Sequence, residues 1–166
     1  DCDHARLVAF SCKRRGFCPS CGGRRMAETA AHLVDSVLPM KPTRQWVLSF
    51  PIPIRLCLSA RPELMTRLLN ITQSTISSYY RAQASLSKSK AMTGSVTLIQ
   101  RFGYIPCREA DIGGSLAVNP HFHSLFIDGT YELNDQKEPS DFHSCPTPKV
   151  RDLEPVLAKI IKRIIK

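Results

Sequence analysis

Hydrophobic positions recur at helical spacing in three segments of the chain, residues 24–38, 62–86 and 153–165. In the second segment the side chains that share one face are Leu64, Leu68, Ile71, Thr75, Ile76 and Tyr79. Pro62 suits the first turn of this helix, because a proline there lacks only an N–H group that would have no partner. The spacing predicts three amphipathic helices.

Three further segments, residues 45–50, 94–102 and 117–127, are typical of buried strands. Pro51 and Pro53 stop the first strand, and Asp128-Gly129 turn the last one. We expect loops over 104–114 and 130–148, where no period is visible. Adjacent strands mixed with helices predict an α+β fold, with helices on one face of an antiparallel sheet.

The composition fits a globular chain with one modest core and a small appended module. Of the 166 residues, 43% are hydrophobic, and no apolar run is long enough to cross a bilayer. The first residues are polar and do not form a signal peptide. Since the sequence opens without methionine, directly on a cysteine motif, we expect a chain cut from a longer protein.

The net charge is +9, and the excess lies in the first two thirds of the chain. Residues 45–103 alone carry seven Lys and Arg side chains against one Glu. This bias fits a nucleic-acid partner, although a generally basic domain would show it too.

The first segment contains a cysteine knuckle, C-P-S-C-G, at Cys18 and Cys21. Cys12 lies just before it, and Cys2 or His4 could complete a tetrahedral zinc site. Disulfides and a redox C-x-x-C are the alternatives, but nothing indicates secretion and no strand precedes the motif. We therefore predict structural zinc, and we interpret the isolated thiols as ordinary ones: Cys57, Cys107 and Cys145.

Basic side chains surround this knuckle, and we predict that they contact DNA phosphates. The candidates are Lys13, Arg14, Arg15, Arg24 and Arg25, together with Arg101 on the second predicted strand. A solvated basic face is the alternative.

His121 and His123 lie two residues apart in the third predicted strand, so both side chains point to the same face. Phe122 points to the other face. H-x-H alone is a weak signal, and ordinary core or surface histidines are commoner. Gln100 on the neighbouring strand could add an oxygen ligand. Such a site would hold Mg²⁺ or Mn²⁺ with open positions for water and phosphate, which suits phosphoryl transfer on DNA.

Four stretches together resemble a known family. They are S-C-K-R-R-G-F-C-P-S-C-G-G-R-R-M-A-E-T-A-A-H-L-V-D, R-Q-W-V-L-S-F-P, V-T-L-I-Q-R-F-G and L-A-V-N-P-H-F-H-S-L-F-I-D-G-T-Y. Their combination and order resemble rolling-circle insertion-sequence transposases of the His-hydrophobic-His (HUH) endonuclease superfamily, which carry an N-terminal zinc-binding domain.

The resemblance implies a zinc-binding domain over 1–38 and an HUH transposase core over 45–166. It implies zinc ligands at Cys2, Cys12, Cys18 and Cys21, and a catalytic metal at His121 and His123. It also implies DNA transposition through a phosphotyrosine intermediate, with single-stranded transposon ends as partner, in the bacterial cytoplasm at the nucleoid.

The family uses two tyrosines spaced Y-x-x-x-Y on a helix, and this chain has no such motif. Tyr79 and Tyr80 are adjacent on a predicted structural helix, and Tyr104 and Tyr131 are single. We therefore expect a fragment, truncated at both ends, that binds DNA but lacks the nucleophiles. The alternatives are a non-catalytic zinc-finger DNA-binding protein and a zinc-dependent protein-interaction module.

Overall fold

The computed structural model describes residues 19–103 and 118–165. The chain divides into two compact units, Asp1–Met40 and Lys41–Lys166. Among the helices of the described ranges, none combines the length and the apolar character needed to cross a membrane.

The described part of the first unit is one helical segment. α1, Pro19–His32, continues into a π-helical turn, η1, Leu33–Val37, which is closed by a 2.8 Å bond from the Leu38 N–H to the Leu33 carbonyl. Leu38 is extended, as a residue before proline prefers, and this ends the helix. The helix expected over 24–38 is confirmed, with an earlier start.

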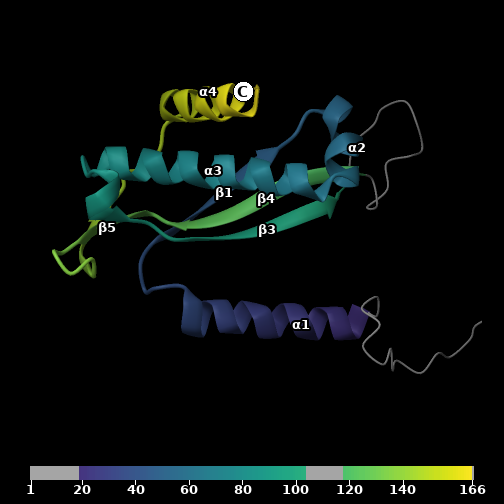
Figure 1. The fold of residues 1–166 in the computed structure, drawn as a ribbon. Helices are drawn as coiled ribbons and strands as arrows, with labels where there is room; N and C mark the ends of the chain where they lie inside the picture. Colours follow the sequence, from purple (N-terminus) through teal and green to yellow (C-terminus); the bar gives the residue numbers. More distant parts are fainter. Residues whose placement is uncertain (1–18, 104–117, 166) are drawn as a thin grey trace, which may run out of the picture. The chain divides into compact units, whose positions relative to one another are not determined.

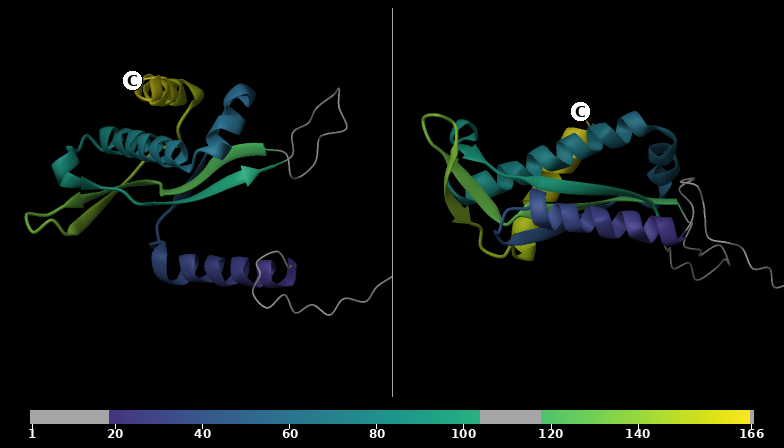
Figure 2. Two further views of the ribbon diagram at one scale, coloured as in Figure 1. Left: turned by 45° about the vertical axis from the view of Figure 1, so that its right-hand side comes forward. Right: turned by 90° about the horizontal axis from the view of Figure 1, so that it is seen from below.

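The second unit is built on a three-stranded antiparallel sheet in the order β1-β4-β3. β1 is Thr43–Ser49, β3 is Ser95–Phe102 and β4 is Val118–Ile127, which confirms the three expected strands. The helices of this unit, α2 (Ile52–Ala60), α3 (Pro62–Gln83) and α4 (Val150–Ile165), lie on one side of the sheet (Figure 1). Two further views show α3 running across that side (Figure 2). The α+β prediction, with helices on one face of an antiparallel sheet, is confirmed.

α2 was not predicted. Pro51 and Pro53 do stop β1, but Pro51 is also the N-cap of α2 and Pro53 lies in its first turn. A first-turn proline costs little because its missing N–H would have no helical partner. The same residues therefore end a strand and begin a helix.

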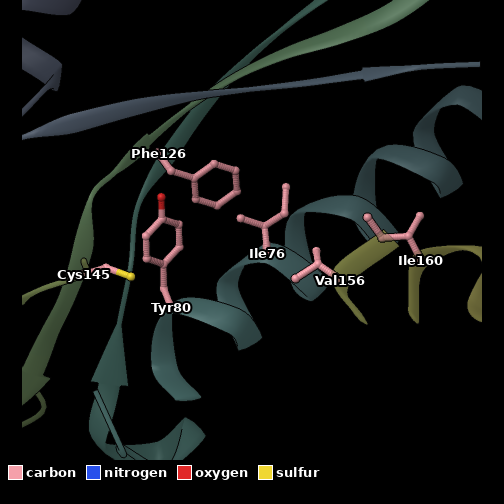
Figure 3. Close-up of a cluster of buried hydrophobic side chains, with 6 residues drawn as sticks. All are labelled: Ile76, Tyr80, Phe126, Cys145, Val156 and Ile160. Carbon is pink, nitrogen blue, oxygen red and sulfur yellow. The ribbon is translucent and has the colours of Figure 1, made fainter. Parts of the chain in front are cut away.

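The core of the second unit lies between the sheet and α3. On β4, Phe122 and Phe126 are fully buried and Ser124 is 1% exposed. Phe122 belongs to one buried cluster, with Phe50, Leu58, Met65 and Leu68. Phe126 belongs to a second cluster, with Ile76, Tyr80, Cys145, Val156 and Ile160 (Figure 3).

The buried stripe of α3 differs from the predicted one by about one position. The buried residues are Met65, Leu68, Thr72, Thr75, Ile76 and Tyr80. Leu64, Ile71 and Tyr79 lie at the border of the stripe and pack against the clusters only in part. Helical spacing predicts which side of a helix is buried. It does not fix the centre of the buried stripe when apolar residues are adjacent in sequence.

A second small antiparallel sheet replaces the loop expected over 130–148, so that expectation was wrong. Its strands are β2 (Ala91–Met92), β5 (Gly129–Leu133) and β6 (Pro139–Ser144), in the order β2-β5-β6, and a short helix, η2 (Lys88–Lys90), precedes β2. Short, polar strands give no clear alternation. Gly129 is required where β4 passes into β5, because a Cβ there would lie 2.3 Å from the His143 carbonyl oxygen.

α4 is the helix expected over 153–165, and it packs on α3 through Val156 and Ile160. Arg163 fixes its last turns, donating to the Ser74 and Thr75 hydroxyls at 2.7 and 2.9 Å. Leu153, Leu157 and Ile161, which belong to the predicted apolar face, remain 39–48% exposed.

A polar network centred on Asp128 connects the junction of β4 and β5 to β1 and α3. The two Asp128 carboxylate oxygens accept hydrogen bonds from Nε and Nη2 of Arg44, and Oδ1 also accepts one from the Tyr80 hydroxyl at 3.2 Å. The Tyr80 oxygen in turn accepts from the Trp46 indole N–H at 3.0 Å. Burial raises the pKa of Tyr80 strongly, and burial with the neighbouring Cys145 raises the pKa of Tyr79 to about 12. Both phenols are therefore neutral at physiological pH.

Candidate functional site

The two histidines of N-P-H-F-H lie on β4, the central strand of the larger sheet. Phe122, Ser124 and Phe126 face the helices, and His121 and His123 are partly exposed on the opposite face. Their ring centroids are 4.8 Å apart. The predicted placement of both imidazoles on one face, away from Phe122, is confirmed.

The strand register decides which side chains surround the pair, because residues directly opposite each other share a face. His121 is opposite Ser49 on β1 and Gln100 on β3. His123 is opposite Val47 and Leu98. Gln100 therefore lies beside His121, as expected for a third ligand, and the helices of this unit cover only the other side of the sheet (Figure 1).

A backbone carbonyl orients the His121 ring. The Nδ1 atom is 2.6 Å from the Asn119 carbonyl oxygen. A carbonyl can only accept, so the proton is on Nδ1 and Nε2 keeps its lone pair. Metal-ligating histidines are commonly held in this tautomer by such a contact.

A side-chain amide holds the His123 ring. The Gln45 Nε2 atom is 2.6 Å from Nδ1, so in this arrangement the amide donates and the ring proton lies on Nε2. Rotation of the amide by half a turn would let its oxygen accept from Nδ1–H instead. The Nε2 atom of His123 would then be free for a metal.

The donor set at this face fits a divalent cation only with an amide as third ligand. No group of three His, Cys, Asp or Glu side chains is close enough to hold a metal ion within residues 19–103 and 118–165. Gln100 donates its amide N–H to the Phe102 carbonyl at 3.0 Å, which leaves its side-chain oxygen available. His121, His123 and Gln100 could thus offer two nitrogens and one oxygen, a set that suits a cation with open positions.

The tyrosines of the described ranges lie on elements other than the strand of the histidine pair. Tyr79 and Tyr80 are on α3, across the sheet from the histidines, and the Tyr80 hydroxyl is engaged by Trp46 and Asp128. Tyr131 is on β5 and packs against the Phe142 ring at 4.9 Å. Tyr104 and the loop expected around it lie outside the described residues.

Most residues of the predicted zinc site lie outside the described part. Cys2, Cys12 and Cys18 precede α1, and Cys21 is in the first turn of α1, but its side chain is not described. Cys57 and Cys145 are free thiols, as expected, and Cys107 lies outside the described residues.

The predicted DNA-contacting cations are only partly placed. Lys13, Arg14 and Arg15 lie outside the described residues. Arg24 and Arg25 are exposed on α1, where Arg24 forms a 3.5 Å surface ion pair with Glu28. Arg101 is exposed on β3 beside Gln100, at a β-bulge.

Sequence reasoning missed Gln45 and Asn119, the hydrogen-bond partners of the two rings. The Asn119 partner is a backbone carbonyl, so side-chain alternation along β4 does not reveal this contact. The Gln45 contact depends on the register between β1 and β4, which the sequence does not reveal.

Comparison with known proteins yields one match. Residues 1–50 match the family model of the transposase zinc-binding domain, a range that reaches through α1 and β1. No curated protein and no solved structure matches the chain. The match supports a transposase-related role for this chain, with structural zinc in the matched segment and DNA as the implied partner.

Proposed function

We propose that the chain belongs to a DNA-transposition enzyme of the rolling-circle, HUH type that acts on single-stranded transposon ends. The observation that carries the proposal is the pairing of His121 with His123, beside Gln100, on the face of the sheet opposite α2, α3 and α4. The match of residues 1–50 to a transposase domain supports it from an independent part of the chain.

In the proposed reaction a tyrosine hydroxyl oxygen attacks a DNA phosphorus. A phosphotyrosine bond forms, the bond to the 3′ oxygen breaks, and that oxygen leaves as a 3′-OH after taking a proton. A divalent cation at His121, His123 and Gln100 would act as a Lewis acid on the scissile phosphate. We propose that the attacking tyrosine is none of Tyr79, Tyr80 and Tyr131; Tyr79 and Tyr80 lie on α3, on the other side of the sheet from the histidines.

The chain's own residues set up this face before DNA binds. The Asn119 carbonyl fixes the His121 tautomer, and Gln45 orients His123. β4 is the central strand, and it pairs with β1 and β3 along both of its edges. This pairing fixes the backbone positions of both histidines. This rigidity is what a metal-assisted phosphoryl transfer needs, since the reacting groups must be pre-positioned.

Mn²⁺ should strengthen the binding of single-stranded DNA through the histidine pair. We expect about a threefold to tenfold gain in affinity for DNA. A cation bound by both imidazoles and by a DNA phosphate adds one contact that monovalent salt cannot provide. Fluorescence anisotropy with a labelled oligonucleotide, with and without Mn²⁺ at constant ionic strength, measures the gain.

The matched control is the His121→Ala/His123→Ala variant, which should bind DNA without the Mn²⁺ increment. A variant that gains as much affinity from Mn²⁺ as the wild-type chain would overturn the proposed site.

The matched segment should hold about one zinc ion per chain. Replacing Cys18 and Cys21 by serine should remove that zinc, because the knuckle supplies two of the four thiolates expected from the resemblance. Elemental analysis of the purified chain measures the content. Cys57→Ser is the control, because this exposed thiol lies in α2 and should leave zinc unchanged. Equal zinc in the wild-type chain and the Cys18/Cys21 variant would refute the assignment.

A further inference from the structure

A groove between α3 and α4 lies away from the histidine pair, on the helix side of the unit. It encloses about 300 Å³. Its α3 wall includes Ser78, Ala82 and Gln83, and its α4 wall includes Arg151, Asp152 and Lys159. Nothing in the proposed reaction uses this groove.

The described lining of the groove carries a net positive charge. Arg151 and Lys159 contribute two cations from α4. Within the described residues Lys159 has no carboxylate within 4.0 Å, and the contact of Arg151 with Asp152 is long, at 3.9 Å. Asp152 is the only acidic residue of the lining, and its other oxygen accepts the Lys149 backbone N–H at 2.8 Å, so it serves to cap α4.

Neighbouring side chains extend this positive strip along both helices. Arg81 reaches the groove wall, where it donates to the Ser78 hydroxyl at 3.0 Å. Arg163 lies on the same side of α4 and donates to Ser74 and Thr75. The acidic residue of α3 is Glu63, in its first turn and far along the helix from the groove, and those of α4 are Asp152 and Glu154, against Arg151, Lys159, Lys162 and Arg163 on the same helix. A polyanion is the ligand that this distribution favours.

We propose that the α3/α4 groove binds the sugar-phosphate backbone of a nucleic-acid strand, as a contact separate from the histidine face. Arg151 and Lys159 would pair with phosphate oxygens, and the Gln83 amide can donate to a third oxygen from the opposite wall. The proposal rests on the proposed function, because it takes DNA as the partner, but it assigns a surface that the metal-assisted reaction does not require.

The test is a salt titration of DNA binding by the whole 166-residue chain, loaded with zinc and free of Mn²⁺. The probe is a fluorescein-labelled single strand of thymidines, followed by anisotropy. Arg151→Ala/Lys159→Ala should bind about tenfold more weakly at low salt, and the slope of log K against log salt should fall by about 1.4, at about 0.7 per phosphate contact.

The matched control is Arg61→Ala/Arg67→Ala. It also removes two exposed cations, but from the other end of α3, outside the groove. It should change the slope by much less. Ala82→Glu should weaken binding as well, because it places an anion at an exposed position of the groove wall without removing a cation. Inorganic phosphate added at constant ionic strength should not compete, because a strand makes several contacts at once.

Equal losses in the groove and control variants would overturn the inference, since they would reflect general electrostatics. Competition by inorganic phosphate would also overturn it in favour of a small-anion site. If the wild-type chain failed to bind DNA at low salt, the proposed function itself would fail. If His121→Ala/His123→Ala lost the Mn²⁺ increment while Arg151→Ala/Lys159→Ala bound like wild type, only the groove would be refuted.

Discussion

Replacing Asp128 by alanine should lower the free energy of unfolding by about 3 kcal/mol. The carboxylate is 11% exposed and accepts from Nε and Nη2 of Arg44, whose side chain is 27% exposed, as well as from the Tyr80 hydroxyl. Its loss leaves a partly buried cation and a buried phenol without their acceptor. The estimate is at the low end for buried pairs, because water reaches Arg44. Urea denaturation followed by Trp46 fluorescence measures the change.

The control for this variant is Asp135→Ala. Asp135 is exposed in the turn between β5 and β6, so the change should be within about 0.5 kcal/mol of wild type. A comparable loss from both substitutions would mean that the Asp128 network does not stabilise the unit as described.

Phe122→Ala should lower the free energy of unfolding by about 4 kcal/mol. The side chain is fully buried and meets the Phe50 ring edge-to-face at a centroid distance of 5.3 Å. Its removal leaves a cavity among Leu58, Met65 and Leu68, where backbone pairing on both sides of β4 restricts collapse. Urea denaturation at fixed pH measures the loss.

The flanking histidines supply the contrast for Phe122. His121→Ala/His123→Ala should lower the free energy of unfolding by only about 1 kcal/mol, since both rings are partly exposed on the face opposite α2, α3 and α4. Val47→Ala is a further control on that face, where Val47 is 55% exposed and should lose less than about 1 kcal/mol. A histidine variant as unstable as Phe122→Ala would contradict the assignment of the two faces.

The larger sheet and its long helix could be predicted because their signals are local. Alternation along β4 separates Phe122 and Phe126 from the histidines, and α3 shows a sustained helical period from Pro62. The smaller sheet could not be predicted in this way. β5 and β6 are short and polar, and they depend on pairing with each other. They also require a glycine at position 129, because the His143 backbone leaves no room for a Cβ there, and only the folded structure shows this approach.

The candidate site shows the same division between local and non-local information. The common face of His121 and His123 follows from their spacing alone, and the position of Gln100 opposite His121 agrees with the expectation from adjacent strands. Its role as a metal ligand stays a prediction. The contact between Gln45 and His123 spans 78 residues of sequence, so only the folded register reveals it.

The measurement that tests the central claim most directly is a Mn²⁺ titration of the zinc-loaded chain. Electron paramagnetic resonance reports free Mn²⁺, so binding appears as loss of that signal. We predict a saturable site for about one Mn²⁺ per chain, and at least tenfold weaker binding in His121→Ala/His123→Ala, with an unchanged circular dichroism spectrum. Equal Mn²⁺ binding by the two proteins, or none by the wild-type chain, would contradict a metal-holding histidine pair.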